Sequence, residues 1–372
     1  MKCSGEFVEK FLNAIVSLDV LPWAGLSTSE LKVVPVIGGL TNILYKVSLV
    51  DREYDSSCPE LLVRVFGAVD GLLDREKENL ILERLSECGI SPRLIAKYDW
   101  GRLEEFLSTR SPLRSGVDMV RITADFDMVS LIAGCLRTLH SVGLGSDSSV
   151  HSANVFEVIE RWLGLSAKYS HTIKASQKCP GFSPPSIELL ITEVKWIRAF
   201  IPNNIMHHPR IVASSICRRL LQEVLCHNDM LAGNLLFDAS DKSLRLIDFE
   251  YSGYNYAVAD IANVCAAVCE SIMLSGQPQD VGKNFPSDQV QLHFVQEYLG
   301  SDFHVSPDDH LPILLIIRAF AMAEELRWTI WGILQSQQAA VGGFDYCMYY
   351  NSRFHAYHEY KEIVVAKLSS LE

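Results

Sequence analysis

The sequence lacks the cysteine patterns that bind metals or cross-link small secreted domains. Its ten cysteines are scattered, and none of them belongs to a Cys-x-x-Cys pair. The nearest two, Cys265 and Cys269, lie one helical turn apart within an apolar run, which is typical of core thiols. We therefore expect neither a zinc site nor a disulfide framework, and a reducing compartment is favoured.

The sequence also lacks a surplus of positive charge and a long apolar run. Its 33 basic and 45 acidic residues give a net charge of −12, which argues against nucleic acid or an anionic membrane surface as the main partner. Glu6 and Glu9 stand where a signal peptide would have its apolar core. The most apolar later stretch, Leu311–Ala323, is interrupted by Arg318 and is too short to span a bilayer. A cytoplasmic protein without membrane insertion is expected.

The composition that remains is that of a globular chain with two lobes. A length of 372 residues is too great for one small core. Residues 1–107 combine an N-terminal amphipathic helix with several β-branched runs, among them Leu61–Phe66, and we assign them to a strand-rich first lobe. Residues 108–372 are dominated by helical spacing and form the second lobe. The expected fold class is α+β.

One block in the second lobe carries the strongest chemical signal. Asn234 follows Asp229 closely, and the apolar runs Leu235–Phe237 and Leu244–Ile247 around a polar turn predict a β-hairpin that ends at Asp248. The hairpin should bring the residues before and after it together. Two carboxylates and a carboxamide would then supply what phosphoryl transfer needs, namely a base for the attacking hydroxyl and oxygen ligands for Mg²⁺.

The same residues also admit a simpler interpretation as a polar loop, because His-x-Asp followed by Asn is a common pattern. The acidic cluster after the hairpin makes that interpretation the weaker one. His227-Asn228-Asp229 with Asn234 resembles the catalytic loop of protein kinases, and Asp248-Phe249 stands where their Asp-Phe-Gly motif would begin.

Several segments, taken in order, are similar to those of the choline/ethanolamine kinases. Aromatic residues at positions 328–354 continue the similarity, which therefore spans most of the chain. The run from Ile247 to Tyr256 is the most specific part of it. The other segments are Gly38–Asn42, Leu61–Gly67, Gly101–Leu107 and His227–Asp229.

This resemblance implies a protein-kinase-like fold and transfer of the ATP γ-phosphoryl group to the hydroxyl of choline or ethanolamine, the first step of phospholipid synthesis by the CDP-choline route. It implies that Asp229 is the base and that Asn234, Asp248 and Glu250 are Mg²⁺ ligands. For the nucleotide it implies that a turn covers the phosphates, formed by Gly38, Gly39, Leu40, Thr41 and Asn42. Arg64, held by Glu78, would contact the phosphates. The backbone of Glu105, Phe106 and Leu107 would bind adenine.

The substrate cation calls for aromatic faces, and the sequence supplies them near the catalytic block and in the C-terminal third. By the same resemblance these are Tyr251, Tyr254, Trp328, Trp331, Tyr346 and Tyr349. The alternative interpretation, an aromatic core at helical spacing, is the weaker one in this family context.

The sequence departs from the family pattern at two places, one of which is Leu231, where a residue inside the catalytic loop is more often polar. Ala266 and Ala267 stand where relatives carry an acidic residue beside the substrate nitrogen. Glu324 shares a predicted helix face with Trp328 and could return that charge, although a solvent-exposed carboxylate is favoured there. Asp260 is expected to brace the catalytic loop, to cap a helix, or to do both.

Four alternatives to a choline kinase follow from the same residues. An ethanolamine-preferring kinase feeding phosphatidylethanolamine synthesis is the nearest, and Tyr346 together with Gly101–Phe106 favours choline over it. An aminoglycoside kinase is disfavoured because the aromatic residues of the C-terminal third would have no role in such an enzyme. A protein kinase is disfavoured because Glu250 replaces the glycine of Asp-Phe-Gly, and an inactive binding module because the catalytic residues are all present. A homodimer is left open.

Overall fold

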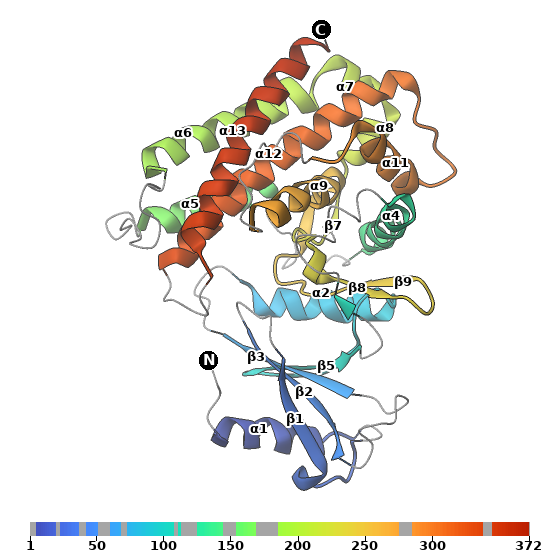
Figure 1. Ribbon diagram of the computed structural model, residues 1–372, viewed down its shortest axis with the longest axis vertical. Helices are drawn as coiled ribbons and strands as arrows, with labels where there is room; N and C mark the ends of the chain where they lie inside the picture. The colour runs from blue at the N-terminus through green and yellow to red at the C-terminus, as the bar shows by residue number, and fades with distance from the viewer. Residues whose placement is uncertain are drawn as a thin grey trace.

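In the computed structural model of the protein, a strand-rich lobe lies at one end and a helical lobe at the other (Figure 1). The structure describes residues 5–19, 23–36, 42–50, 60–67, 73–107, 111–112, 125–143, 154–168, 185–274, 285–337 and 344–371. The glycine turn at positions 38–41 lies outside these ranges, and so does most of the loops 140–154 and 171–186. The α+β class and the two-lobed arrangement are confirmed.

The first lobe is a five-stranded antiparallel sheet in the order β1-β2-β3-β5-β4. Helix α1 packs Phe11 and Ile15 against it, next to Tyr45 and Val47, because its apolar residues recur at helical spacing. The lobe consists of α1 (Gly5–Val16), the short 3-10 helix η1 (Thr28–Glu30), β1 (Leu31–Val36), β2 (Asn42–Leu49), β3 (Glu60–Phe66), α2 (Arg75–Glu87), β4 (Leu94–Tyr98) and β5 (Gly101–Phe106).

Helix α2 lies between the sheet and the second lobe (Figure 1). It begins at Asp74, whose side chain accepts a hydrogen bond from the backbone of Lys77, and ends before Gly89, which has a φ of +72°. Ile81 and Leu85 are fully buried, and Glu78 lies on the same face of the helix and is buried with them. A carboxylate on that face requires a buried cation.

Helices dominate the second lobe. Its helices are α4 (Phe126–Ser141), α5 (Val155–Lys168), α6 (Ile187–Phe200), η4 (Ile201–Met206), α7 (Pro209–Ala213), α8 (Ser215–Leu220), η5 (Ala232–Asn234), α9 (Ala257–Leu274), α11 (Asp288–Leu299), α12 (Pro307–Gln337) and α13 (Tyr346–Ser369). Its strands are β6 (Ser111–Pro112), β7 (Glu223–Cys226), β8 (Leu235–Asp238), β9 (Ser243–Leu246) and β10 (Gly253–Tyr256).

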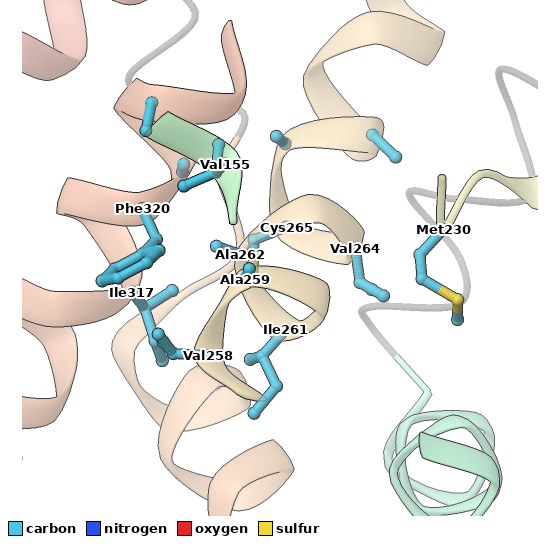
Figure 2. Close-up of a cluster of buried hydrophobic side chains, with 14 of the residues drawn as sticks. Val155, Met230, Val258, Ala259, Ile261, Ala262, Val264, Cys265, Ile317 and Phe320 are labelled. Carbon is cyan, nitrogen blue, oxygen red and sulfur yellow. The ribbon is translucent and has the colours of Figure 1, made fainter. Parts of the chain in front are cut away.

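Helices α9 and α12 form the centre of this lobe. Ala259 and Ala262 leave room for α12, whose Ile317 and Phe320 lie close by (Figure 2). Helix α12 is buried from Pro312 to Gln335, so the apolar stretch noted in the sequence is part of a longer central helix. None of the helices in the described ranges combines the length and apolar character that crossing a bilayer requires.

Candidate active site

The catalytic loop joins β7 to the predicted hairpin and places Asp229 against Asn234. The amide nitrogen of Asn234 donates hydrogen bonds to the backbone oxygen of Asp229 at 2.8 Å and to its carboxylate Oδ2 at 3.0 Å. Both side chains are buried. The carboxylate of Asp229 is therefore fixed in one orientation, as a base for a substrate hydroxyl must be.

The hairpin β8–β9 brings Asp248 to the same place, as the sequence predicted. Leu235 pairs with Leu246, and the backbone N–H of Ile247 donates to the carbonyl of Asn234 at 3.1 Å. Asp248 follows directly with a φ of +66°, a conformation that non-glycine residues adopt where the surroundings impose it. The structure thus places Asp229, Asn234 and Asp248 around one point.

Asp260 holds the catalytic loop from below. Its carboxylate accepts hydrogen bonds from the backbone N–H groups of His227 at 2.7 Å and Asn228 at 2.8 Å. His140 of α4 lies 3.0 Å from the same carboxylate. Burial alone would raise the pKa of Asp260, but these partners lower it, so the carboxylate stays charged. The brace is confirmed, whereas the expected N-cap is wrong because Asp260 lies inside the first turn of α9.

Asn228 is fixed from several sides in addition. It has a φ of +63°, and its side-chain amide donates to the backbone oxygen of Tyr251 at 3.1 Å. Its own backbone oxygen accepts a hydrogen bond from Arg327 of α12. The residue before the expected base is therefore tied to three separate elements, which keeps Asp229 in place.

Arg64 and Glu78 do not form the expected ion pair. Arg64 donates instead to Glu104 at 2.8 Å and to Asp248 at 3.1 Å, while Glu78 accepts from Arg102 at 2.7 Å. The reason is the register of the sheet, in which Arg102 on β5 stands directly opposite Arg64 on β3. Arg102 lies nearer α2, and Glu104 accepts from both guanidinium groups.

Arg102 and Glu104 lie in the segment Gly101–Leu107, but no role was predicted for either of them from the sequence. Both are almost fully buried, at 1% and 2% exposure. Strand alternation puts them on the same face of β5, and two opposite charges at positions i and i+2 of an apolar strand are the signal that would have indicated a buried ion pair.

The carboxylate of Glu104 predicts a specific acid sensitivity. Burial alone would raise its pKa, but Arg64 and Arg102 lower it to about 2, from an ordinary value of 4.5. Because the folded-state pKa is the lower one, the stabilisation is complete above pH 4.5 and is lost as the pH falls toward 2. We expect the free energy of unfolding to decrease over that window. Urea unfolding measured from about pH 5 to about pH 3 gives the slope of the free energy of unfolding against pH.

Glu104→Gln removes this titration and should flatten the slope, whereas Glu87→Gln on the exposed end of α2 should not change it. An equal slope for the wild type and Glu104→Gln would contradict the assignment of the acid sensitivity to Glu104.

The candidate metal ligands are hard oxygen donors. Asp248 and Glu250 lie two residues apart, and the side chain of Glu250 is 6% exposed with Arg75 at 3.7 Å. Because the nitrogen of the Asn234 carboxamide faces Asp229, its oxygen is available to a cation. Carboxylates and a carboxamide are the donors that Mg²⁺ prefers, so this set fits the expected ion.

Part of the expected nucleotide site lies within the described residues. Asn42 is buried at the start of β2, opposite Phe66. The backbone N–H of Glu105 already donates to the carbonyl of Arg93 at 2.9 Å, and its side chain lies 3.6 Å from Arg245 of the other lobe. Phe106 and Leu107 follow at the end of β5. Gly38, Gly39, Leu40 and Thr41 lie outside the described residues.

The structure brings most of the predicted aromatic residues into one cluster. The ring of Tyr251 lies 5.3 Å from that of Trp328, and Trp331 follows at 5.5 Å. Tyr346 and Tyr349 lie 5.9 and 5.5 Å from Trp331. The indole N–H of Trp331 donates to the hydroxyl of Tyr251 at 2.8 Å. We call these five residues the aromatic cluster.

Two residues alter the predicted composition of this cluster. Trp162 of α5 was not foreseen, and its ring lies 5.9 Å from Tyr251 and 6.3 Å from Trp328. Tyr254 is half-buried on β10, where it pairs with Leu225, so its role in substrate binding stays a prediction.

The expectation for Glu324 is wrong. Its side chain is 1% exposed and pairs with Arg327 at 2.6 Å, because α12 is surrounded by other helices. The guanidinium of Arg327 in turn stacks on Trp328, 4.3 Å from the ring centre. Ala266 and Ala267 are buried in α9. One carboxylate oxygen of Glu324, Oε2, is therefore already paired beside the aromatic cluster, while Oε1 is buried without a hydrogen-bond partner among the described residues.

The comparison with known families agrees with this geometry. Residues 33–358 match the family model described as choline/ethanolamine kinase. The chain belongs to the choline/ethanolamine kinase family. It is 28% identical over 352 residues to a probable ethanolamine kinase of Arabidopsis thaliana, covering 94% of this chain and 84% of that one. Membership supports a kinase that acts on the alcohol group of choline or ethanolamine.

Solved structures share the fold. A choline kinase of Cryptosporidium parvum superposes with a TM-score of 0.75 at 22% identity, covering 97% of each chain. An aminoglycoside phosphotransferase, solved as a ternary complex with streptomycin and ATP, superposes with a TM-score of 0.56 at 13% identity, covering 96% of this chain and 97% of that one. The protein-kinase-like fold is therefore confirmed for this choline/ethanolamine kinase family member.

Proposed function

We propose that this protein transfers the γ-phosphoryl group of ATP to the hydroxyl of choline in the presence of Mg²⁺, and that ethanolamine is the poorer substrate. The observation that carries the proposal is the position of Tyr251. Its hydroxyl accepts a hydrogen bond from Trp331 of the aromatic cluster, and burial together with the charges of Glu250, Asp229 and Asp248 raises the pKa of that hydroxyl. A site for an organic cation thus adjoins the expected base and metal ligands.

The chain's own residues account for most of the chemistry. Asp229, oriented by Asn234, would accept the proton of the choline hydroxyl as the new bond to phosphorus forms. Asp248, Glu250 and the oxygen of Asn234 would hold Mg²⁺, which when bound offsets the negative charge on the phosphates. Arg64 carries a guanidinium fork beside Asp248 that matches two phosphate oxygens.

The nucleotide contacts rest on the resemblance and on position. We propose that the turn Gly38–Asn42 covers the phosphates and that the backbone of Phe106 and Leu107, at the end of β5, receives adenine. The N–H of Glu105 is already engaged within the protein, so Glu105 would contribute through its carbonyl. With the lobe boundary that we propose between residues 107 and 108, this site would lie where the two lobes meet. A cytoplasmic location and a homodimer stay predictions from the sequence.

The nature of the cluster favours choline. A trimethylammonium group has no N–H donor and is attracted to aromatic faces, at about 0.5–2 kcal/mol for each contact. Ethanolamine has three donors, and each one left without an acceptor on burial costs about 1–3 kcal/mol. Glu324 of α12 is paired with Arg327 through one carboxylate oxygen, and α9 presents Ala266 and Ala267 instead of an acid.

We therefore expect kcat/KM for choline to exceed that for ethanolamine by at least about tenfold, which corresponds to about 1.4 kcal/mol. Release of ADP with choline, with ethanolamine and with a simple alcohol measures this ratio. Equal values for the two amines would refute the preference, and no turnover of either amine would refute the proposed function.

A substitution separates the aromatic cluster from a general effect on folding. Trp331→Ala should raise KM for choline more than it lowers kcat. Trp196→Ala is the matched control, because Trp196 stacks on Phe200 of α6 and lies outside the aromatic cluster. A normal KM in Trp331→Ala would remove Trp331 from the substrate site.

A further inference from the structure

Buried and partly buried charges at the lobe boundary form a continuous series of opposite signs. Arginines and carboxylates alternate along it. From Asp248 at one end to Glu250 at the other, the distances between successive partners are 3.1, 2.8, 2.7, 2.7, 2.9 and 3.7 Å. It begins and ends on the same tripeptide, at the two expected metal-binding carboxylates on either side of Phe249. In order, the arginine–carboxylate chain is Asp248, Arg64, Glu104, Arg102, Glu78, Arg75 and Glu250.

The three arginines of the arginine–carboxylate chain differ in how many of their hydrogen-bond donors have a partner. Arg102 donates to Glu104, to Glu78 and, at 2.9 Å, to Asn79. It is almost fully buried and serves the internal structure. Arg75 donates one hydrogen bond, from Nη1 to Glu78 at 2.9 Å.

The second terminal nitrogen of the Arg75 guanidinium, Nη2, is buried and has no hydrogen-bond partner among the described residues. Glu250 lies 3.7 Å from Nη1, too far for a hydrogen bond. The guanidinium is kept in position by Phe66, whose ring centre is 4.7 Å away. A buried donor of a charged group without an acceptor is costly, so its presence beside Glu250 indicates that it serves a ligand.

We infer that Arg75 is a second phosphate-binding arginine of the nucleotide site, and this inference rests on the proposed use of ATP and Mg²⁺. In the free protein, Arg64 and Arg75 neutralise Asp248 and Glu250. Asp248 and Glu250 would hold Mg²⁺, whose charge would neutralise them in place of the arginines, and the two guanidinium groups would then be available to phosphate oxygens.

Arg75→Met should therefore change the affinities for ATP and for Mn²⁺ in opposite directions. Binding of ATP with Mg²⁺ should weaken about tenfold or more, because a charge-assisted hydrogen bond is lost. Binding of adenosine, which has no phosphate, should not change. Binding of Mn²⁺ in the absence of nucleotide should tighten, since Glu250 no longer has a cation beside it.

The experiment uses the full chain with calorimetry for ATP and adenosine and electron paramagnetic resonance for Mn²⁺. Arg84→Met is the matched control, because Arg84 lies on the same helix with its side chain about half exposed and should change none of the three. Arg75→Lys keeps the charge without the fork and should fall between the wild type and Arg75→Met. Melting temperatures verify that each variant is folded.

The outcomes distinguish this inference from the function on which it rests. Wild-type affinity for ATP in Arg75→Met overturns the inference alone. Parallel weakening of ATP, adenosine and Mn²⁺ shows that Arg75 only maintains the structure, and also overturns it. Failure of Arg75→Met to fold leaves Arg75→Lys to decide by the same readouts. If the wild type itself does not bind ATP with Mg²⁺, the proposed function and the inference both fail.

Discussion

Asp229→Asn is expected to lower kcat by about 10²–10⁴-fold while leaving nucleotide binding intact. A primary alcohol is too weak an acid to ionise at neutral pH, so its proton must pass to a positioned base as the bond to phosphorus forms. The substituted carboxamide has the same shape, and its oxygen can still accept the hydrogen bond that Asn234 donates to Asp229 at 3.0 Å. The loss is therefore of proton affinity and not of geometry.

Steady-state kinetics with choline and calorimetry with ATP measure these two effects separately. Asp241→Asn is the matched control, because Asp241 lies exposed in the β8–β9 turn, where it accepts hydrogen bonds from Ser243. A kcat close to that of the wild type in Asp229→Asn would show that Asp229 is not the base and would overturn the central assignment.

Asp248→Ala is expected to lower kcat/KM by about 10³-fold or more and also to weaken Mg²⁺-dependent nucleotide binding. The substitution removes a hard oxygen ligand, and the charge stabilisation that a catalytic metal provides is worth several kcal/mol. It also deprives Arg64 of one of its two carboxylates, at 3.1 Å, and leaves only Glu104. Both the expected metal and the arrangement of the phosphate arginine are then affected.

Asn234→Ala serves as the comparison for this prediction. A neutral carboxamide is a weaker ligand than a carboxylate, so high Mg²⁺ concentrations should restore part of the activity of Asn234→Ala. The same concentrations should not rescue Asp248→Ala. Turnover measured over a Mg²⁺ titration tests both variants, and full activity of Asp248→Ala at ordinary Mg²⁺ concentrations would refute its role as a ligand.

The structure ties catalysis to the packing of the second lobe. Asp260 of α9 fixes the N–H groups of the catalytic loop, and Arg327 of α12 binds the carbonyl of Asn228. The same Arg327 stacks on Trp328 of the aromatic cluster. The element that presents the expected base and the element that presents the substrate site therefore share one buried guanidinium. This shared contact explains why α12 carries charged residues in an otherwise apolar environment.

The sequence by itself determined the features that depend on short separations along the chain. The hairpin after Asn234 followed from two apolar runs around a polar turn, and it fixes the convergence of Asp229, Asn234 and Asp248. The N-terminal helix, α1, followed from apolar residues at helical spacing in the same way. Hydrogen bonds between near neighbours leave few alternative geometries, so the residue pattern is sufficient.

Only the tertiary structure decided which distant charges meet. The partner of Arg64 depends on the register of β3 against β5 and on how α2 packs across the lobe boundary, and a shift of one residue would present the other face of the strand. Glu324 was expected in solvent because helical spacing alone does not show how many neighbours a helix has. Helix α12 is buried from Pro312 to Gln335, so Glu324 and Glu325 lie away from solvent and are paired with Arg327 and Arg353.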